Sequence, residues 1–351
     1  KNLFQKMNKA INYKDLKVFA KKILLKIGLD NFSANTVTHG LCEASLRGVT
    51  SHGIRLLPHY VNSALNGRKN PKPKFKFKKN FLSLGTLDAD NAFGHAAGVK
   101  ALKYCQNMAK KTGVGIVAVK NSSHPGALAS IALPIAKKGY MVFAFTHADS
   151  LLLSHNGKRP YFGTNPICFA APRQNEEPYC LDMATSMISW NKLLMFRTKK
   201  KKLDTQLASD SKGMSTSDPF EAKSLFGAGS YKGYGLASMV EVLCGIYTGM
   251  KFGRSIPAMY TTPISKKRKL GQFYIVIRTD GCISSKKFKS RMLQLSKEIR
   301  KEPTRNKKSK VILPNDKEIL IMKRQIKKGV KINLETYREL KKLSEKFNLK
   351  F

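Results

Sequence analysis

His124 is the residue whose type and setting point most directly to acid–base chemistry. It lies in the segment Asn121-Ser122-Ser123-His124-Pro125-Gly126, which we expect to form a turn between a strand and a helix. Such turns bring side chains to the edge of a sheet, where ligands commonly bind. Because histidine titrates near neutral pH, it can exchange a proton with a hydroxyl or carbonyl oxygen. The alternative for this histidine is a capping or hydrogen-bonding role.

A second polar cluster consists of Ser51-His52-Gly53 followed by Arg55, where a helix is expected to end. A guanidinium group binds a carboxylate through two parallel hydrogen bonds. We therefore interpret Ser51, His52 and Arg55 as candidates for holding an anionic substrate. An ordinary surface loop is the alternative.

Lys232 and Asp182 are candidates for binding a cofactor. Lys232 follows the glycine-rich segment 227–230 and opens an expected helix. A helix start together with a lysine favours phosphate, although a solvated lysine is an equal alternative. Asp182 ends an expected short strand, so its carboxylate could hold a ribose hydroxyl or cap the next helix. The nearest match to G-x-G-x-x-G, at 233–238, lacks the third glycine and follows no expected strand, which argues against a Rossmann site.

Hydrophobic periodicity places these candidates among alternating strands and helices, which predicts an α/β fold. Ser33 is the expected N-cap of the second helix, and Pro134 is expected to bend or end the third. A breaker-rich segment, 66–73, is the expected linker and first domain boundary. The predicted helices are 13–29, 33–47, 126–138, 231–250 and 334–347, and the predicted strands are 115–119, 140–146, 167–171, 179–183 and 272–277.

The net charge of +43, from 65 Lys+Arg against 22 Asp+Glu, is typical of a protein that adsorbs to polyanions. Nucleic-acid binding is one interpretation, and a solvated lysine surface is the other. The basic runs 199–202 and 266–269 lie beside no recognised nucleic-acid-binding motif, so we do not expect nucleic acid as a partner.

Other features of the composition exclude several classes. No stretch of ~18 apolar residues predicts a membrane span, and residues 1–20 lack a secretory signal. The six cysteines form no C-x-x-C pair and no Cys/His cluster, so we expect neither a zinc site nor a disulfide framework, and a cytoplasmic location with reduced thiols.

Six motifs together carry a resemblance to a known family. They occur in the order Ser51-His52-Gly53, His124-x-Gly126, Gly163-Thr164-Asn165-Pro166, Asp182-Met183-Ala184-Thr185-Ser186, Thr216-Ser217-Asp218-Pro219 and Tyr231-Lys232-Gly233-Tyr234-Gly235-Leu236. In this order and spacing the chain closely resembles the malate/L-lactate dehydrogenase family, a type-2 family that includes ureidoglycolate and sulfolactate dehydrogenases. The resemblance runs from about residue 13 to the C-terminal helix. The later segments 252–254, 259–260 and 268–272 look most like ureidoglycolate dehydrogenase.

The resemblance implies a non-Rossmann, NAD(P)-binding mixed-sheet domain at 74–285. A helical domain at 1–73 is completed by 286–351, and such proteins are typically homodimers. The implied reaction passes a hydride between NAD or NADP and a small 2-hydroxy acid or 2-oxo acid. His124 matches the family's catalytic acid/base, and Ser51, His52 and Arg55 fall in the substrate-binding loop. Cofactor-contacting positions match Asp182, Met183, Ala184, Lys232, Gly233 and Arg268.

The chain departs from the family pattern at four places. The arginine after Ser-His-Gly comes one residue early, at Arg55, and the other departures are at 206–208, 314–316 and 146–149. Two further functions are alternatives: an imine reductase acting on a cyclic 2-carboxylate, and a basic nucleic-acid-associated protein without enzyme activity.

Overall fold

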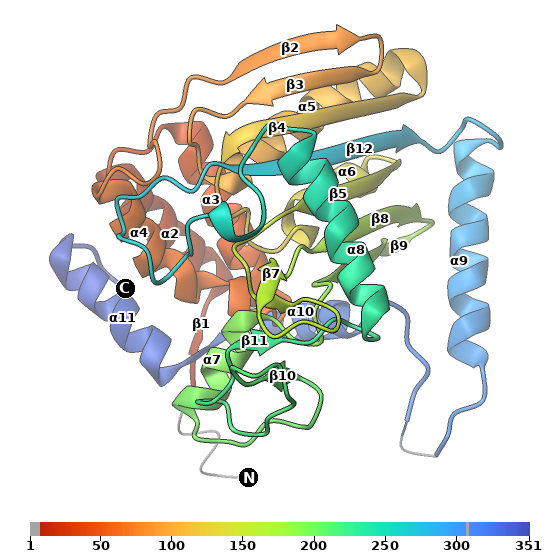
Figure 1. Ribbon diagram of the computed structural model, residues 1–351. Coiled ribbons are helices and arrows are strands. Elements are labelled where there is room, and N and C mark those ends of the chain that lie inside the picture. Colours follow the sequence, from red (N-terminus) through yellow and green to blue (C-terminus); the bar gives the residue numbers. More distant parts are fainter. Residues whose placement is uncertain (1–7, 307–308) are drawn as a thin grey trace.

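A seven-stranded sheet is the centre of the computed structural model, which describes residues 8–306 and 309–351 (Figure 1). Among its described strands, β3 and β4 pair in parallel and all other neighbours pair antiparallel. This mixed sheet confirms the prediction of a non-Rossmann α/β fold, because a Rossmann sheet is mostly parallel. In spatial order the strands are β2 (Lys76–Phe81), β3 (Leu84–Asp88), β4 (Val114–Ser122), β12 (Leu270–Arg278), β5 (Tyr140–Thr146), β8 (Ile167–Arg173) and β9 (Glu176–Met183).

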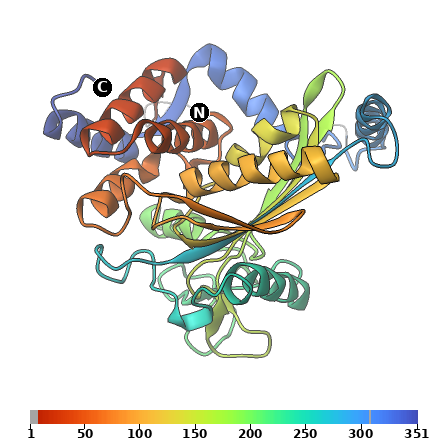
Figure 2. The same ribbon diagram turned by 90° about the horizontal axis from the view of Figure 1, so that it is seen from above.

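Helices cover both faces of this sheet (Figure 2). One face carries α5 (Gly94–Thr112) and α6 (Ala129–Lys137), and the other carries α8 (Tyr231–Glu241) and the π-helical turn η3 (Val242–Ile246). Side chains of a strand point alternately to the two faces. Val142 of β5 accordingly packs in the core under α5 and α6, whereas its neighbours Phe143 and Phe145 pack on the side of α8.

The helical part of the molecule is built from both ends of the chain. It contains α2 (Tyr13–Lys26), α3 (Asn31–Leu46), α4 (Leu57–Leu65) and α11 (Leu334–Lys346), while β1 (Asn8–Ile11) pairs antiparallel with β13 (Val330–Asn333). Leu16 and Leu24 from one end and Leu340 from the other are buried in one hydrophobic cluster. The amphipathic helices of the two chain ends therefore share one core, as the family resemblance implied.

Smaller elements complete the structure. A four-stranded sheet has the order β10 (Ala208–Ser209), β11 (Ser224–Leu225), β6 (Leu152–Leu153) and β7 (Pro160–Phe162). The remaining helices are α7 (Trp190–Thr198), α9 (Ser285–Lys301) and α10 (Asp316–Lys328), with 3-10 turns η1 (Thr50–His52), η2 (Ile54–Leu56) and η4 (Gly253–Ser255). None of the helices in the described part of the chain is long and apolar enough to cross a membrane.

The expected N-cap of the second helix was wrong, and Pro134 does not end the third helix. The N-cap of α3 is Asp30, whose carboxylate accepts a hydrogen bond from the backbone N–H of Ser33 at 2.7 Å. The helix α6 begins at Ala129 and continues through Pro134 without ending there. A proline leaves the carbonyl four residues earlier without its helical donor. That carbonyl belongs to Ser130 and lies 3.0 Å from Nε2 of His39, so an imidazole N–H can replace the missing donor.

Two other segments also differ from their predictions. The predicted helix 231–250 is α-helical only to Glu241 and continues as the π-helical turn η3. Within the predicted linker 66–73, Arg68 and Lys69 are each only 3% exposed. The guanidinium of Arg68 donates to the carbonyl oxygens of Met259 and Pro263 at 2.8 and 2.7 Å, which holds this segment inside the protein.

Candidate active site

The predicted turn between β4 and α6 places His124 at the edge of the sheet. Gly126, two residues later, has φ +71° and lies against the buried ring of His95, so a Cβ at this position would clash with that ring. Both the left-handed conformation and the lack of space require glycine. The His-x-Gly spacing is therefore a packing requirement of the turn that presents His124.

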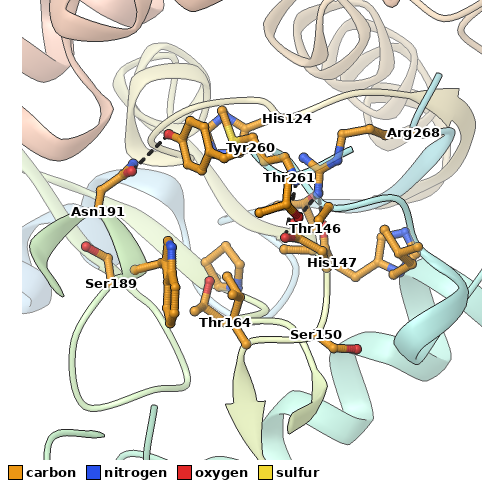
Figure 3. A pocket seen from close by; sticks show the side chains of 18 of the residues that line it. His124, Thr146, His147, Ser150, Thr164, Ser189, Asn191, Tyr260, Thr261 and Arg268 are labelled. Carbon is orange, nitrogen blue, oxygen red and sulfur yellow. Dashed lines mark hydrogen bonds and ion pairs between the residues drawn. The ribbon is translucent and has the colours of Figure 1, made fainter. Parts of the chain in front are cut away.

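A cavity of about 350 Å³ opens in front of His124 (Figure 3). Its size is that of a site for a small molecule. Residues from several parts of the chain line it, including His52, His124, Asp149, Tyr260 and Arg268. We call it the His124 cavity. The 146–149 segment, one of the departures from the family pattern, also forms part of its wall.

Nδ1 of His124 is occupied by a protein partner. The hydroxyl of Tyr60, a fully buried residue of α4, lies 2.9 Å from this nitrogen. The ring of His52 stacks beside that of His124, with centroids 5.4 Å apart and an interplanar angle of 26°. Ser51 Oγ in turn lies 2.8 Å from Nδ1 of His52. Because Tyr60 occupies Nδ1, Nε2 is the nitrogen of His124 left for a substrate.

The surroundings of His124 favour its neutral form. Burial lowers its pKa well below the ordinary value, and the nearby His52, Arg268 and Lys69 lower it further. Burial, followed by the charge of Arg55, lowers the pKa of His52 to about 4. At neutral pH both imidazoles are therefore uncharged, and His124 is prepared to accept a proton from a hydroxyl group.

Arg268, which the sequence assigned to the cofactor, lies in the His124 cavity. It is 5% exposed, forms an ion pair with Asp149, and donates from Nε to the carbonyl oxygen of Pro257 at 2.9 Å. Arg55 is not among the residues that line this cavity. It lines a separate groove between α7 and the segment 331–338, and its nearest polar contact is the carbonyl oxygen of Ser51 at 3.5 Å.

Two hydrogen bonds connect the predicted substrate loop, residues 51–55, to Tyr260 on the cavity wall, and Figure 3 shows the one between Tyr260 and Asn191. Tyr260 donates to Oδ1 of Asn191 at 2.9 Å, and Nδ2 of Asn191 donates to the carbonyl oxygen of Ser51 at 3.0 Å. The sequence did not indicate Tyr60, Asn191 or Tyr260 as site residues. Their only signal was that residues 259–260 belonged to a segment used for the resemblance.

The predicted cofactor positions on β9 and α8 lie in adjacent segments. The N–H of Ala228, just before α8, donates to the carbonyl oxygen of Thr185 at 2.8 Å. A Cβ on Gly233 would clash with both of these backbone groups, so α8 can approach the segment after β9 only with glycine there. Lys232 is exposed at the same helix start. This glycine-lined helix N-terminus with a lysine fits a phosphate group.

Asp182 has a structural contact of its own. Its Oδ2 accepts a hydrogen bond from the N–H of Ala129 at 2.8 Å, so it caps the start of α6. Of the two alternatives from the sequence, the structure shows helix capping, although α6 precedes Asp182 in the chain and is not the next helix. Met183 ends β9 opposite Ile167, and Ala184 follows it.

Comparisons with known proteins agree with this geometry. The profile of the malate/L-lactate dehydrogenase family matches residues 11–341. The chain belongs to this family. The resemblance drawn from the six motifs is thereby confirmed.

Three proteins that are similar to this chain carry different printed activities. The NAD(+)-dependent ureidoglycolate dehydrogenase of Escherichia coli is 33% identical over 276 residues, which is 79% of each chain. The crystal structure of malate dehydrogenase from Entamoeba histolytica has a TM-score of 0.93 and 28% identity, and covers 98% of this chain and 99% of that one. A Δ1-piperideine-2-carboxylate reductase from Pseudomonas syringae has a TM-score of 0.86 and 26% identity, covering 95% and 99%. Both a hydroxy-acid dehydrogenase and an imine reductase are thus similar to this family member.

Proposed function

We propose that this protein transfers a hydride between a nicotinamide cofactor and C2 of a small 2-hydroxy acid or its 2-oxo acid, with His124 exchanging the hydroxyl proton. The observation that carries this proposal is the pairing of His124 with Tyr60. It directs Nε2 of a neutral imidazole toward a cavity whose wall contains a buried arginine. A base for the proton and a cation for the carboxylate are the two groups that such a substrate requires.

The protein's own groups have separate tasks in this reaction. When bound, NAD or NADP accepts or supplies the hydride. Arg268 is our choice for orienting the substrate carboxylate, with His52 beside it, because Arg55 faces another groove. The N-terminus of α8 with Lys232 is our choice for a cofactor phosphate. During oxidation His124 Nε2 takes the hydroxyl proton, and during reduction protonated His124 returns it to the oxygen.

Imine reduction is the second candidate function, and the likeness to the Pseudomonas syringae reductase favours it. The same cavity could present a C=N bond of a cyclic 2-carboxylate, with His124 exchanging a proton with nitrogen. Only the substrate distinguishes this candidate from the first.

We also propose that the protein acts as a homodimer. Five large apolar side chains on α8, η3 and the following turn are between 40% and 55% exposed, although they recur at helical spacing: Leu236, Met239, Val242, Ile246 and Tyr247. An apolar stripe of this kind is typical of a surface that packs against a partner. A monomer in sedimentation analysis at micromolar concentration would contradict this proposal.

The decisive experiment follows NADH and NADPH absorbance with oxaloacetate, pyruvate, oxalurate, sulfopyruvate and a cyclic imine acid. Oxidation of the cofactor by one of the 2-oxo acids, lost in His124→Ala, supports the first candidate. Turnover with the imine alone supports the second. No turnover with any acceptor, together with salt-sensitive RNA binding that a nicotinamide cofactor does not affect, would favour the nucleic-acid alternative.

A further inference from the structure

Lys69 is a buried cation without a conventional partner. Lys69 is only 3% exposed, and its Nζ has no hydrogen-bond partner within the described ranges 8–306 and 309–351. Instead Nζ lies 3.5 Å from the ring centroid of Tyr60 and 4.6 Å from that of Phe93. Burying an unpaired ammonium is costly. Two aromatic faces offset only part of that cost, so this position calls for a functional explanation.

The aromatic partner of Lys69 is also the hydrogen-bond partner of His124. The ring of Tyr60 contacts Nζ through its face, while its hydroxyl lies 2.9 Å from Nδ1 of His124. Lys69 and His124 also line one small cavity of about 10 Å³, together with His59 and Arg268. The two titratable groups are thus joined both through Tyr60 and across a space no larger than a water molecule.

The titratable groups around Lys69 and His124 are, with one exception, bases or phenols. They come from the substrate loop, α4 and the segment after it, the start of α5, the segment after β5 and the region before β12: His52, His59, Tyr60, Arg68, His95, Asp149, Tyr260 and Arg268. The single carboxylate in this set is Asp149, and it is engaged by Arg268. A positive charge on Lys69 and one on His124 would therefore oppose each other without compensation.

We propose that Lys69 is a positioning residue for His124: it holds Tyr60 against Nδ1 and forms a coupled pair with His124, in which a proton on one group disfavours a proton on the other. The proposal rests on the proton-transfer role assigned to His124 under the proposed function.

The pKa values of Lys69 and His124 are both lowered. Burial, followed by the charges of Arg268 and Arg68, lowers the pKa of Lys69 well below its ordinary value. The pKa of His124 is also lowered, and Lys69 is one of the causes. Removing the ammonium therefore raises the pKa of His124.

The test compares Lys69→Met with a matched control, Lys100→Met. Lys100 also places its ammonium over two aromatic rings, at 5.7 Å from Phe32 and 5.8 Å from Phe75, but it lies on α5 and lines neither cavity. The readout is the titration of the histidine ring nitrogens by ¹⁵N NMR, with the His124 signals assigned by their loss in His124→Gln. We expect the pKa of His124 to rise by about one unit or more in Lys69→Met and to stay unchanged in Lys100→Met.

A second readout is the pH profile of kcat/KM, whose lower limb should move by the same amount and direction. Lys69→Arg keeps the charge and should keep the wild-type titration of His124. If Lys69→Met does not fold, Lys69→Gln is used with the same expected shift. An unchanged His124 titration in the folded neutral variant overturns the inference.

The experiments distinguish failure of the proposed function from failure of the inference about Lys69. An active wild-type enzyme with no shift in Lys69→Met leaves the function standing and removes the inference. A shift in the NMR titration without any dehydrogenase or imine reductase activity supports the coupled pair and removes the proposed function.

Discussion

The hydroxyl of Tyr60 and Nδ1 of His124 lie 2.9 Å apart, although 64 residues separate them in the chain. This contact joins the helical part of the molecule, through α4, to the turn that follows β4. A histidine used for proton transfer commonly has a carboxylate behind it, whereas His124 has a neutral phenol. Burial raises the pKa of Tyr60, so its phenol stays neutral, and its oxygen can accept a hydrogen bond from the Nδ1–H of His124. Nε2 is then the nitrogen that exchanges protons with the substrate.

Removing the imidazole and removing its partner should have different effects. His124→Gln is expected to lower kcat by about 10²–10⁴-fold while cofactor binding and the melting temperature stay near wild type. Tyr60→Phe loses one hydrogen bond to the ring, worth about 1 kcal/mol, and should lower kcat by about fivefold. Steady-state kinetics and cofactor titration by fluorescence measure both.

A matched control for Tyr60→Phe is Tyr13→Phe. It removes a hydroxyl that donates to Glu43 at 3.1 Å, and Tyr13 lines neither cavity. If Tyr13→Phe and Tyr60→Phe lower kcat equally, the contact between Tyr60 and His124 has no special role.

Substrate affinity should depend on Arg268 and hardly on Arg55. Arg268→Lys keeps the positive charge next to Asp149 but loses the planar, two-pronged geometry that binds a carboxylate. We expect KM for the 2-oxo acid to rise by about tenfold or more, as for loss of a charged hydrogen bond of about 1.5–3 kcal/mol. Arg55→Lys, in the separate groove, should leave KM within about twofold. A larger effect at Arg55 would reverse the assignment.

Two glycines in the first turns of α8 provide a sharp comparison for the cofactor site. A methyl group on Gly233 would clash with the backbone of Ala228 and Thr185, whereas at Gly235 it would meet open space. Gly233→Ala should therefore displace the helix start and weaken NADH binding, with a cost of about 1–3 kcal/mol.

Gly235→Ala should instead leave NADH binding unchanged and stabilise the protein by about 0.5–1 kcal/mol, because alanine favours the helix. Calorimetry measures the NADH affinity of both variants, and thermal unfolding measures their stability. Equal NADH affinity in the two variants would exclude the α8 N-terminus as a cofactor contact.

Stability should fall in mild acid because of buried neutral histidines. Burial, followed by nearby charges, lowers the pKa of His95 to about 3, that of His59 to about 3 and that of His52 to about 4. Below about pH 6.5, the ordinary pKa of histidine, the unfolded chain binds more protons than the folded chain. The free energy of unfolding is therefore largest above pH 6.5 and falls as the pH drops toward 4, by about 1.4 kcal/mol per pH unit for each such group.

His95→Phe tests this directly, since His95 is fully buried and both its ring nitrogens lack partners among the described residues. Between pH 6.5 and 5 the variant should lose about 2 kcal/mol less unfolding free energy than wild type in urea titrations. His155→Phe, at an exposed position, is the control that should follow wild type.

The sequence by itself determined the local features of this protein. Apolar spacing placed β5 at its observed bounds and β4, β12, α2 and α11 within a few residues, since periodicity reports which face of each element is buried. It also placed His124 in a strand-to-helix turn. Because the motifs lie at characteristic spacing along the chain, their order was enough to indicate the family.

The tertiary structure decided which groups meet. Tyr60 and Lys69 reach His124 only because the helical part packs against the turn after β4, and Asp182 caps α6 from 53 residues further along the chain. Arg268 reaches the same cavity because the 257–268 segment folds back against Asp149. Arg55 was the arginine expected to bind the substrate, but it lines a separate groove. Local periodicity determines burial along one element, whereas contacts between distant elements depend on how their surfaces pack, and that information is not local.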